Sequence, residues 1–369
     1  MKKTLELPGF VDVHVHFRDP GLPAAETTAS GLRAAARGGF AAVVTMPNTT
    51  PACDSPAIVD YQRAAARAAG VGVRLWPSGT ITKGRLGRET ADLEALWEAG
   101  VAFFTDDGSF VEDDQTMFEA MRRAAALDMV VCQHAMTWKG GLSPGRNVIR
   151  DCPLARRLSL GVIPVWVETD AIARDIRLCR ETGVRLHIQH ISTAEGVELV
   201  RAAQREGLRI TAEATPHHLL FACDELSVDD ANFKMAPPLG NREDRAELRR
   251  AVKDGVLMFA TDHAPHPVQS KASGFAGSAN GIVGLEAAIP ATYRAMVEEQ
   301  GMSVDAWAKA WHEMPLEIIS PRAGIEGLPK TTIEIGEERA LSVGDFASFS
   351  RNCPYDGMKF DCWPKKGES

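Results

Sequence analysis

The 369-residue chain lacks several features that would assign it to a class at once. No apolar run reaches the roughly 18 residues needed to cross a bilayer. The N-terminal stretch "MKKTLELPGF" has no apolar core of the kind found in a signal peptide. Basic residues are not in excess, since 41 Lys and Arg face 49 Asp and Glu for a net charge of −8. Nucleic-acid binding needs a basic surface, so we expect a small-molecule substrate and neither a nucleic-acid nor a membrane partner.

Paired cysteines and a glycine-rich phosphate loop are also missing. The seven cysteines are scattered, odd in number and without a CxxC pair. This pattern is typical of reduced thiols and predicts a cytoplasmic protein. No GxGxxG follows the first candidate strand, which argues against a doubly wound dinucleotide-binding sheet.

Short apolar runs alternate with amphipathic stretches along most of the chain. The candidate strands are 9–17, 41–48, 72–79, 101–107, 129–135, 185–192, 208–218 and 256–265. The candidate helices between them include 26–38, 55–69, 114–127, 168–182 and 194–206. Eight such alternations predict a parallel sheet closed into a (β/α)₈ barrel over 1–334. The tail, 335–369, shows no clear element, and we expect it to pack on the barrel as irregular chain.

The first candidate strand carries two histidines, His14 and His16, in "GFVDVHVHFRDPG". Side chains two residues apart on a strand point to the same face, so the two imidazoles can share a metal. The alternation places Val13, Val15 and Phe17 on the other face. An isolated HxH is also compatible with incidental histidines, so the interpretation depends on further ligands.

Further ligands follow at the ends of later strands. They are Asp106 or Asp107 after the fourth strand, His134 after the fifth, His190 after the sixth and Asp262 after the eighth. The carboxyl ends of barrel strands meet on one face, where active sites lie. Nitrogen and oxygen ligands without thiolate favour zinc over manganese or cobalt. The sequence therefore predicts two metals per chain, with one carboxylate bridging them.

This ligand set predicts hydrolysis of an amide or a related C–N bond. Two metals sharing a hydroxide supply a nucleophile near neutral pH and polarise the carbonyl that it attacks. Asp262, in "TDHAPH", is the candidate to take the proton and pass it to the leaving nitrogen.

The motifs "PGFVDVHVHFRDPG", "TMPNT", "FTDDG", "QHIST", "TPHHL" and "TDHAPH" together resemble the dihydroorotase family of amidohydrolases, from about residue 7 to 290. The resemblance implies interconversion of N-carbamoyl-L-aspartate and L-dihydroorotate in pyrimidine synthesis. It makes His14 and His16 ligands of one metal and His134 and His190 ligands of the other. Many relatives bridge their metals with a carbamylated lysine, but "FTDDG" has none, so the resemblance is to the aspartate-bridged branch.

The resemblance also assigns the remaining roles. Asp107 is the better match for the bridge, with Asp106 in reserve, and Asp262 matches the acid/base beside the first metal. Arg18, Asn48 and His266 match residues that hold the substrate carboxylate. An arginine fork with an amide and an imidazole is a chemically sound carboxylate clamp. We also expect a homodimer and leave open an association with aspartate transcarbamoylase.

Three features depart from the family pattern. The chain starts directly at the first barrel strand, so the usual small β-sandwich domain is expected to be largely absent. Ala236 stands where relatives carry an asparagine near the substrate, and "AMT" follows His134 where acidic residues are common. These departures keep two alternatives open: a hydantoinase-like or allantoinase-like enzyme, and a non-catalytic subunit supporting aspartate transcarbamoylase.

The remaining histidines are interpreted as structural. We expect His217 and His218 to be structural residues of the seventh strand, His187 to lie away from the barrel mouth, His263 to point opposite to Asp262, and His312 to be incidental.

Overall fold

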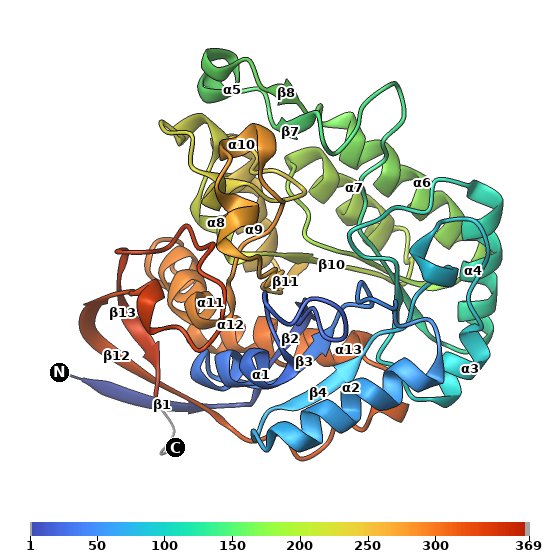
Figure 1. Ribbon diagram of the computed structural model, residues 1–369, viewed down its shortest axis with the longest axis horizontal. Helices are drawn as coiled ribbons and strands as arrows, with labels where there is room; N and C mark the ends of the chain where they lie inside the picture. The colour runs from blue at the N-terminus through green and yellow to red at the C-terminus, as the bar shows by residue number, and fades with distance from the viewer. Residues whose placement is uncertain (1, 366–369) are drawn as a thin grey trace.

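The computed structural model describes residues 2–365, and its centre is a barrel of parallel strands (Figure 1). The barrel strands are β2 (Phe10–Val15), β3 (Phe40–Thr45), β4 (Arg74–Pro77), β5 (Phe104–Thr105), β6 (Val130–Gln133), β9 (Arg185–Ile188), β10 (Ile210–Ala214) and β11 (Leu257–Phe259). Seven lie within the predicted strand ranges, and β3 begins one residue before its predicted range of 41–48. Nearly all of their residues are buried, as expected for parallel strands covered on both faces.

The barrel closes through two short contacts between a three-stranded and a five-stranded sheet. The sheets have the orders β2-β3-β4 and β11-β10-β9-β6-β5. Gly79 bridges in parallel to Phe104 at one seam, and Val15 bridges to His263 at the other. The second seam carries a hydrogen bond from the His16 N–H to the His263 carbonyl at 2.8 Å. The predicted (β/α)₈ barrel is therefore confirmed.

Helices on the outside of the barrel connect successive strands. The long ones are α1 (Thr28–Arg37), α2 (Pro56–Ala69), α4 (Asp114–Ala126), α6 (Trp166–Thr182), α7 (Ala194–Arg205) and α9 (Arg242–Lys253), joined by the shorter α3 (Leu93–Glu98) and α11 (Leu285–Thr292). Helix α1 shows why they start where they do, because Thr27 and Ser30 form a reciprocal capping box at its first turn. Between β6 and α6 the chain makes an excursion with β7 (Asn147–Ile149), α5 (Pro153–Leu158) and β8 (Gly161–Val162), seen at the top of Figure 1.

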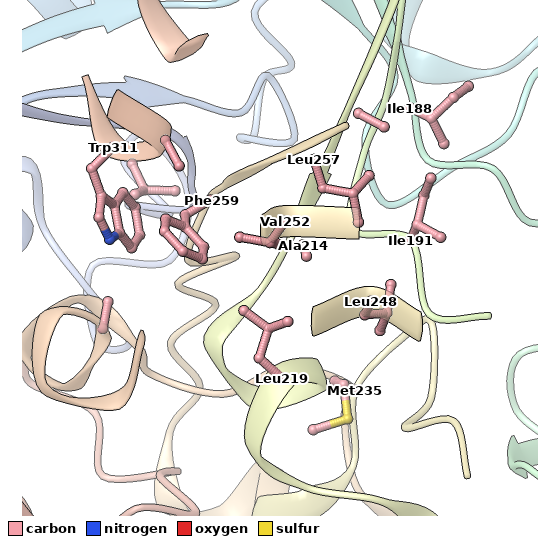
Figure 2. Close-up of a cluster of buried hydrophobic side chains, with 14 of the residues drawn as sticks. Ile188, Ile191, Ala214, Leu219, Met235, Leu248, Val252, Leu257, Phe259 and Trp311 are labelled. Carbon is pink, nitrogen blue, oxygen red and sulfur yellow. The ribbon is translucent and has the colours of Figure 1, made fainter. Parts of the chain in front are cut away.

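The apolar core lies mainly between the strands and the helices. Figure 2 shows part of it, where Leu248 and Val252 of α9 lie beside Ala214 of β10 and Leu257 of β11. A smaller cluster includes strand residues such as Val11 and Val44 together with Ile318 and Ile319. The Ser320 N–H donates to the Ala102 carbonyl, so this cluster fills the barrel at the amino ends of the strands.

Strand β2 departs from simple alternation. Its register with β3 shifts between Asp12 and Val15, where the strand carries an extra residue. Val13 consequently packs in the cluster inside the barrel, whereas Val15 and Phe17 belong to the outer core. The expectation that Val13 shares a face with Val15 was wrong, because a β-bulge re-aims the side chains that follow it.

A small antiparallel sheet beside the barrel corrects the description of both ends of the chain. Strand β1 (Lys3–Leu7) precedes the first barrel strand and pairs with β12 (Thr331–Ala340), which pairs with β13 (Lys359–Pro364). Figure 1 shows this sheet at the left. The chain therefore does not enter the barrel directly, and the tail is not irregular up to residue 365. The domain boundary at 334/335 stays a prediction, although β12 runs across it. Residues 366–369 of the predicted tail lie outside the described part.

Within residues 2–365, no helix combines the length and apolar character required for a membrane span.

Candidate metal centre

Five side chains from four barrel strands meet at the carboxyl ends of those strands. They form two groups that could each hold a metal ion: His14, His16 and Asp107, and Asp107, His134 and His190. All five are buried. Asp107 belongs to both groups, so its carboxylate is the one that can bridge two ions.

Asp107 lies at the centre of the imidazoles. Its Oδ1 is 3.3 Å from His14 Nε2 and 3.4 Å from both His134 Nδ1 and His190 Nε2, and its Oδ2 is 3.3 Å from His16 Nε2. Burial opposes ionisation of this carboxyl. The coulombic field of His14 and the close approach of the other imidazoles nevertheless hold its pKa well below the usual range. Asp107 is therefore an anion among four nitrogen ligands.

Unsatisfied polar atoms in the centre also indicate that these residues fit divalent metals. His14 Nε2 and Asp107 Oδ1 are buried without a hydrogen-bond partner, which is costly unless another group engages them. His134 Nδ1 and His190 Nε2 face each other at 3.0 Å, so two ring nitrogens converge where only one proton can lie between them. These unsatisfied and crowded atoms are ones that cations would stabilise.

The neighbouring Asp106 has a different task. Its Oδ1 accepts from the N–H groups of Ile81 and Thr82, and its Oδ2 accepts from the Thr82 hydroxyl. The carboxylate is thereby committed to the loop after β4. Of the two candidates for the bridge, the geometry favours Asp107.

Asp262 lies against the first of the two groups. Its Oδ1 is 3.0 Å from His16 Nε2 and 3.5 Å from His14 Nε2. Burial raises its pKa, but the charge of His14 and the hydrogen bond from His16 outweigh burial and lower the pKa below the ordinary range. Asp262 is therefore ionised and able to accept a proton.

Asp262, His190 and Arg18 also share an uncommon backbone. Their φ angles are 48°, 34° and 55°, in the left-handed region that non-glycine residues rarely adopt. Such conformations cost about 1–3 kcal/mol each and persist where the surrounding structure imposes them. Three such residues around one centre indicate that the surrounding structure holds the backbone of the site in place.

A cavity of about 250 Å³ opens over the metal groups. Arg18, Asn48 and His266, the predicted clamp residues, all line it together with Asp107 and Asp262. The remaining lining residues are His16, Gly108, His134, Trp138, Pro144, His190, Ala236, Ala264, Asn280 and Gly281. Sequence reasoning did not single out Trp138, Pro144, Asn280 or Gly281, which come from loops whose approach to the strand ends has no pattern in the sequence.

Backbone carbonyls and one tail residue hold the clamp side of the cavity. Arg18 Nε donates to the Pro265 carbonyl at 3.3 Å, and His266 Nε2 donates to the Asn280 carbonyl at 2.7 Å. Asn352, from the C-terminal tail, accepts the His266 N–H and donates to the carbonyls of Ala264 and Gly281. Burial, followed by the charge of Arg18, lowers the pKa of His266 to about 3, so its ring is neutral.

Among residues 2–365, the side chains of the other histidines make no hydrogen bond to either metal group. His217 and His218 are buried in the short helix α8 (Pro216–Leu220), so their placement on a strand was wrong. His263 faces Glu26 at 3.4 Å, away from Asp262, as expected. His187 lies inside the barrel and bonds to Glu213, and His312 bonds to the Gly9 carbonyl.

Comparison with known proteins shows the family to which the chain belongs. Residues 3–196 match the family described as "Dihydro-orotase-like". The dihydroorotase of Bacillus caldolyticus is 41% identical over 365 residues, covering 98% of this chain and 84% of the relative. The dihydroorotase of Brevibacillus brevis is 40% identical over 363 residues, covering 96% and 84%. The chain belongs to the dihydroorotase family.

Solved structures support the fold of this dihydroorotase family member. L-hydantoinase from Arthrobacter aurescens superposes with a TM-score of 0.83 at 24% identity, covering 98% of this chain and 83% of that one. A dihydroorotase from Saccharomyces cerevisiae superposes with a TM-score of 0.74 at 17% identity, covering 98% of both chains. At these identities the likeness concerns the amidohydrolase barrel alone.

Proposed function

We propose that this chain is a metal-dependent dihydroorotase that interconverts N-carbamoyl-L-aspartate and L-dihydroorotate. One observation carries the proposal: a single cavity is lined both by the metal-binding groups and by Arg18, which has no carboxylate within salt-bridge distance among residues 2–365. A cyclic amide with a carboxylate substituent matches both features. The family assignment and the named relatives support the same reaction.

Two divalent ions, for which zinc is the expected metal, would be held by His14 and His16 on one side and by His134 and His190 on the other. Asp107 would bridge them. When bound, such ions lower the pKa of water to near neutrality and polarise the carbonyl of the ring amide.

Asp262 is the proposed acid/base. Its ionised carboxylate lies beside the first metal group and lines the cavity. In the hydrolytic direction it takes a proton from the attacking water and delivers it to the ring nitrogen as the C–N bond breaks. In ring closure it removes that proton from the carbamoyl nitrogen.

Arg18, Asn48 and His266 are the proposed carboxylate clamp. The guanidinium supplies a planar fork of N–H donors, which suits a carboxylate better than a point charge does. His266 already donates Nε2–H to the Asn280 carbonyl, so Nδ1 can donate to the substrate only when it is also protonated. We therefore expect binding of the carboxylate to raise the pKa of this ring and to favour its protonated form.

The cellular setting is also proposed. All seven cysteines are buried and free, which supports a reducing, cytoplasmic compartment. A homodimer and an association with aspartate transcarbamoylase stay predictions, and sedimentation of the purified chain alone and with that enzyme would test both.

The decisive experiment is a side-by-side assay of the purified, zinc-loaded chain on dihydroorotate, hydantoin and allantoin. Turnover of dihydroorotate alone is the expected result. Preference for either uncharged ring would make the chain a hydantoinase-like or allantoinase-like enzyme. Absence of turnover on all three, with metal bound, would favour the non-catalytic alternative.

A further inference from the structure

A buried carboxylate, Glu213, lies beneath the metal groups on the inner face of β10. Its side chain is 1% exposed, and no part of the proposed reaction uses it. The strand reads "ITAEA", in which Thr211 and Glu213 share one face because they are two residues apart. A charge placed inside a barrel is costly unless its oxygen atoms are engaged.

Both carboxylate oxygens of Glu213 accept hydrogen bonds, one from two metal-centre residues and the other from His187. Oε1 accepts from His14 Nδ1 at 2.6 Å and from the His190 backbone N–H at 3.2 Å. Oε2 accepts from His187 Nε2 at 2.9 Å. One oxygen atom therefore contacts a residue from each of the two metal groups, which otherwise share only Asp107.

The contact with His14 selects a tautomer. His14 must be neutral to bind a metal, and an ionised carboxylate can only accept, so the one proton of the metal-binding ring lies on Nδ1. The lone pair is then on Nε2, the buried nitrogen that has no hydrogen-bond partner and lies 3.3 Å from Asp107. Glu213 thus turns His14 into a ligand that presents Nε2 toward the centre.

The contact with His190 acts on the backbone. His190 has a φ of 34°, and its N–H would be unpaired in this conformation without an acceptor inside the barrel. The next N–H, of Ile191, donates to the carbonyl of Glu213 itself at 3.0 Å. One residue of β10 therefore accepts hydrogen bonds from two successive amides after β9. These bonds fix the backbone position from which the His190 ring projects.

His187 completes the arrangement from below. Its Nδ1 lies 2.8 Å from the Thr211 hydroxyl, which can donate to it, leaving the proton of the neutral ring on Nε2 to be donated to Glu213. His187 and Thr211 are direct partners in the β9–β10 register. The chain Thr211–His187–Glu213–His14 therefore has a donor and an acceptor at every link.

We propose that Glu213 is a positioning residue that couples the two metal groups from beneath, holding the His14 tautomer and the His190 backbone at once. This inference rests on the proposed metal centre. It predicts that losing Glu213 weakens binding of both metal ions together, whereas a partner of His14 alone would weaken only one. Partners of this kind change metal affinity by about 10–100-fold.

The test is metal titration of the apo-protein against a chromophoric zinc chelator, for the wild type and for Glu213→Gln. The amide keeps the shape but must turn an NH₂ group toward either His14 or His187. We expect both zinc equivalents to bind about 10–100-fold more weakly. Glu286→Gln is the matched control, because Glu286 is also a buried carboxylate but accepts from the Ala347 and Ser348 backbone, away from the ligands.

A second variant covers a failure of Glu213→Gln to fold. Thr211→Val leaves the charge in place but removes the donor to His187, and a smaller loss of affinity in both equivalents is expected. Unchanged affinity in the folded variants, or loss confined to one equivalent, would overturn the inference. If the wild type binds a single zinc ion, the two-metal proposal fails by itself. Weaker binding of that ion in the variants would then support a role for Glu213 limited to positioning its ligands.

Discussion

The two ends of the cavity are built in different ways. At the metal end, His14, His134 and His190 come directly from the ends of barrel strands or the residues next to them. At the clamp end, Arg18 and His266 lie in loops and are held by backbone carbonyls and by Asn352 of the tail. Strand ends are fixed by the whole barrel, whereas loops can change without disturbing it. The difference suggests that the reaction type is tied to the fold and that substrate choice is adjustable.

Removing a metal ligand should produce the largest effect. His190→Ala deletes a ligand of the second group, and we expect metal content to fall and turnover to drop by about 10³-fold or more, because metal ions supply several kcal/mol of transition-state stabilisation. Elemental analysis and a dihydroorotate assay measure the two effects. His312→Ala, which bonds only to the Gly9 carbonyl, is the control and should match the wild type. Full activity of a metal-free His190→Ala protein would refute the metal centre.

Asp262 lies beside the first metal group and lines the cavity, and its substitution tests the proposed proton transfer separately from metal binding. Asp262→Asn keeps the size of the side chain but cannot carry the proton. Turnover should fall by about 10²–10⁴-fold, with most of the metal retained. Steady-state kinetics together with metal analysis of the same sample test this. Wild-type-like turnover would assign the proton transfer to another group.

The clamp end is tested by Arg18→Lys. The ammonium keeps the charge but not the planar fork, so kcat/KM for dihydroorotate should fall by about 10–100-fold, as for loss of a charge-assisted hydrogen bond. Metal content should not change, in contrast to His190→Ala. Any weak activity on hydantoin should also be unaffected. Equal losses on both substrates would mean that Arg18 does not hold a carboxylate.

Proton uptake provides a finer test of the clamp. The free enzyme holds His266 neutral because burial and Arg18 lower its pKa to about 3. A bound carboxylate favours the charged ring and raises this pKa, so proton uptake with the ligand should increase as the pH is lowered from 7 toward 5. Calorimetry of orotate binding in two buffers of different ionisation enthalpy counts the protons. The uptake should disappear in His266→Asn, and persistence there would place the proton elsewhere.

The smallest effect is expected from the tail. Asn352→Ala removes three hydrogen bonds that join the loops after β11. The buried groups left unpaired should lower the free energy of unfolding by about 1–3 kcal/mol, measured by urea denaturation. A rise in KM without loss of metal should accompany it. A change in metal content instead would show that the two ends are less independent than their construction suggests.

The sequence predicted the barrel better than its surroundings. All eight strands could be located from the sequence because each is a short, buried apolar run between amphipathic helices, several of which end in glycine. Strand β12 was missed because "TTIEIGEERA" carries charged residues over its second half and is only partly buried. Its partner β1 pairs Lys3 with Ile335 across almost the whole chain. Local patterns carry no information about such a pairing.

In the candidate site, too, features with a local sequence pattern were predicted and features that depend on the fold were not. Histidines at strand ends were found from spacing. The structure brings the predicted site residues to the lining of one cavity, except His14, which is buried against Asp107, and the roles of these residues stay predictions. The position of Val13 failed because a bulge breaks the two-residue period. Glu213 was missed because a glutamate inside a strand looks the same in the sequence whether it faces water or a ligand. Only the fold reveals that it touches His14.

Closure of the barrel between β2 and β11 has a consequence for how the chain matures. Asp262 contacts His16 across 246 positions of sequence, and this contact joins the first and last barrel strands. Domains made from contacts of such long range form only after the distant segments are present together. During synthesis, therefore, His14 and His16 leave the ribosome long before the residues that complete their surroundings, because the chain emerges N-terminus first. The five ligands are all synthesised by residue 190, but β11 and Asp262 come later, so we expect the site to take its final arrangement only after residue 262 has emerged.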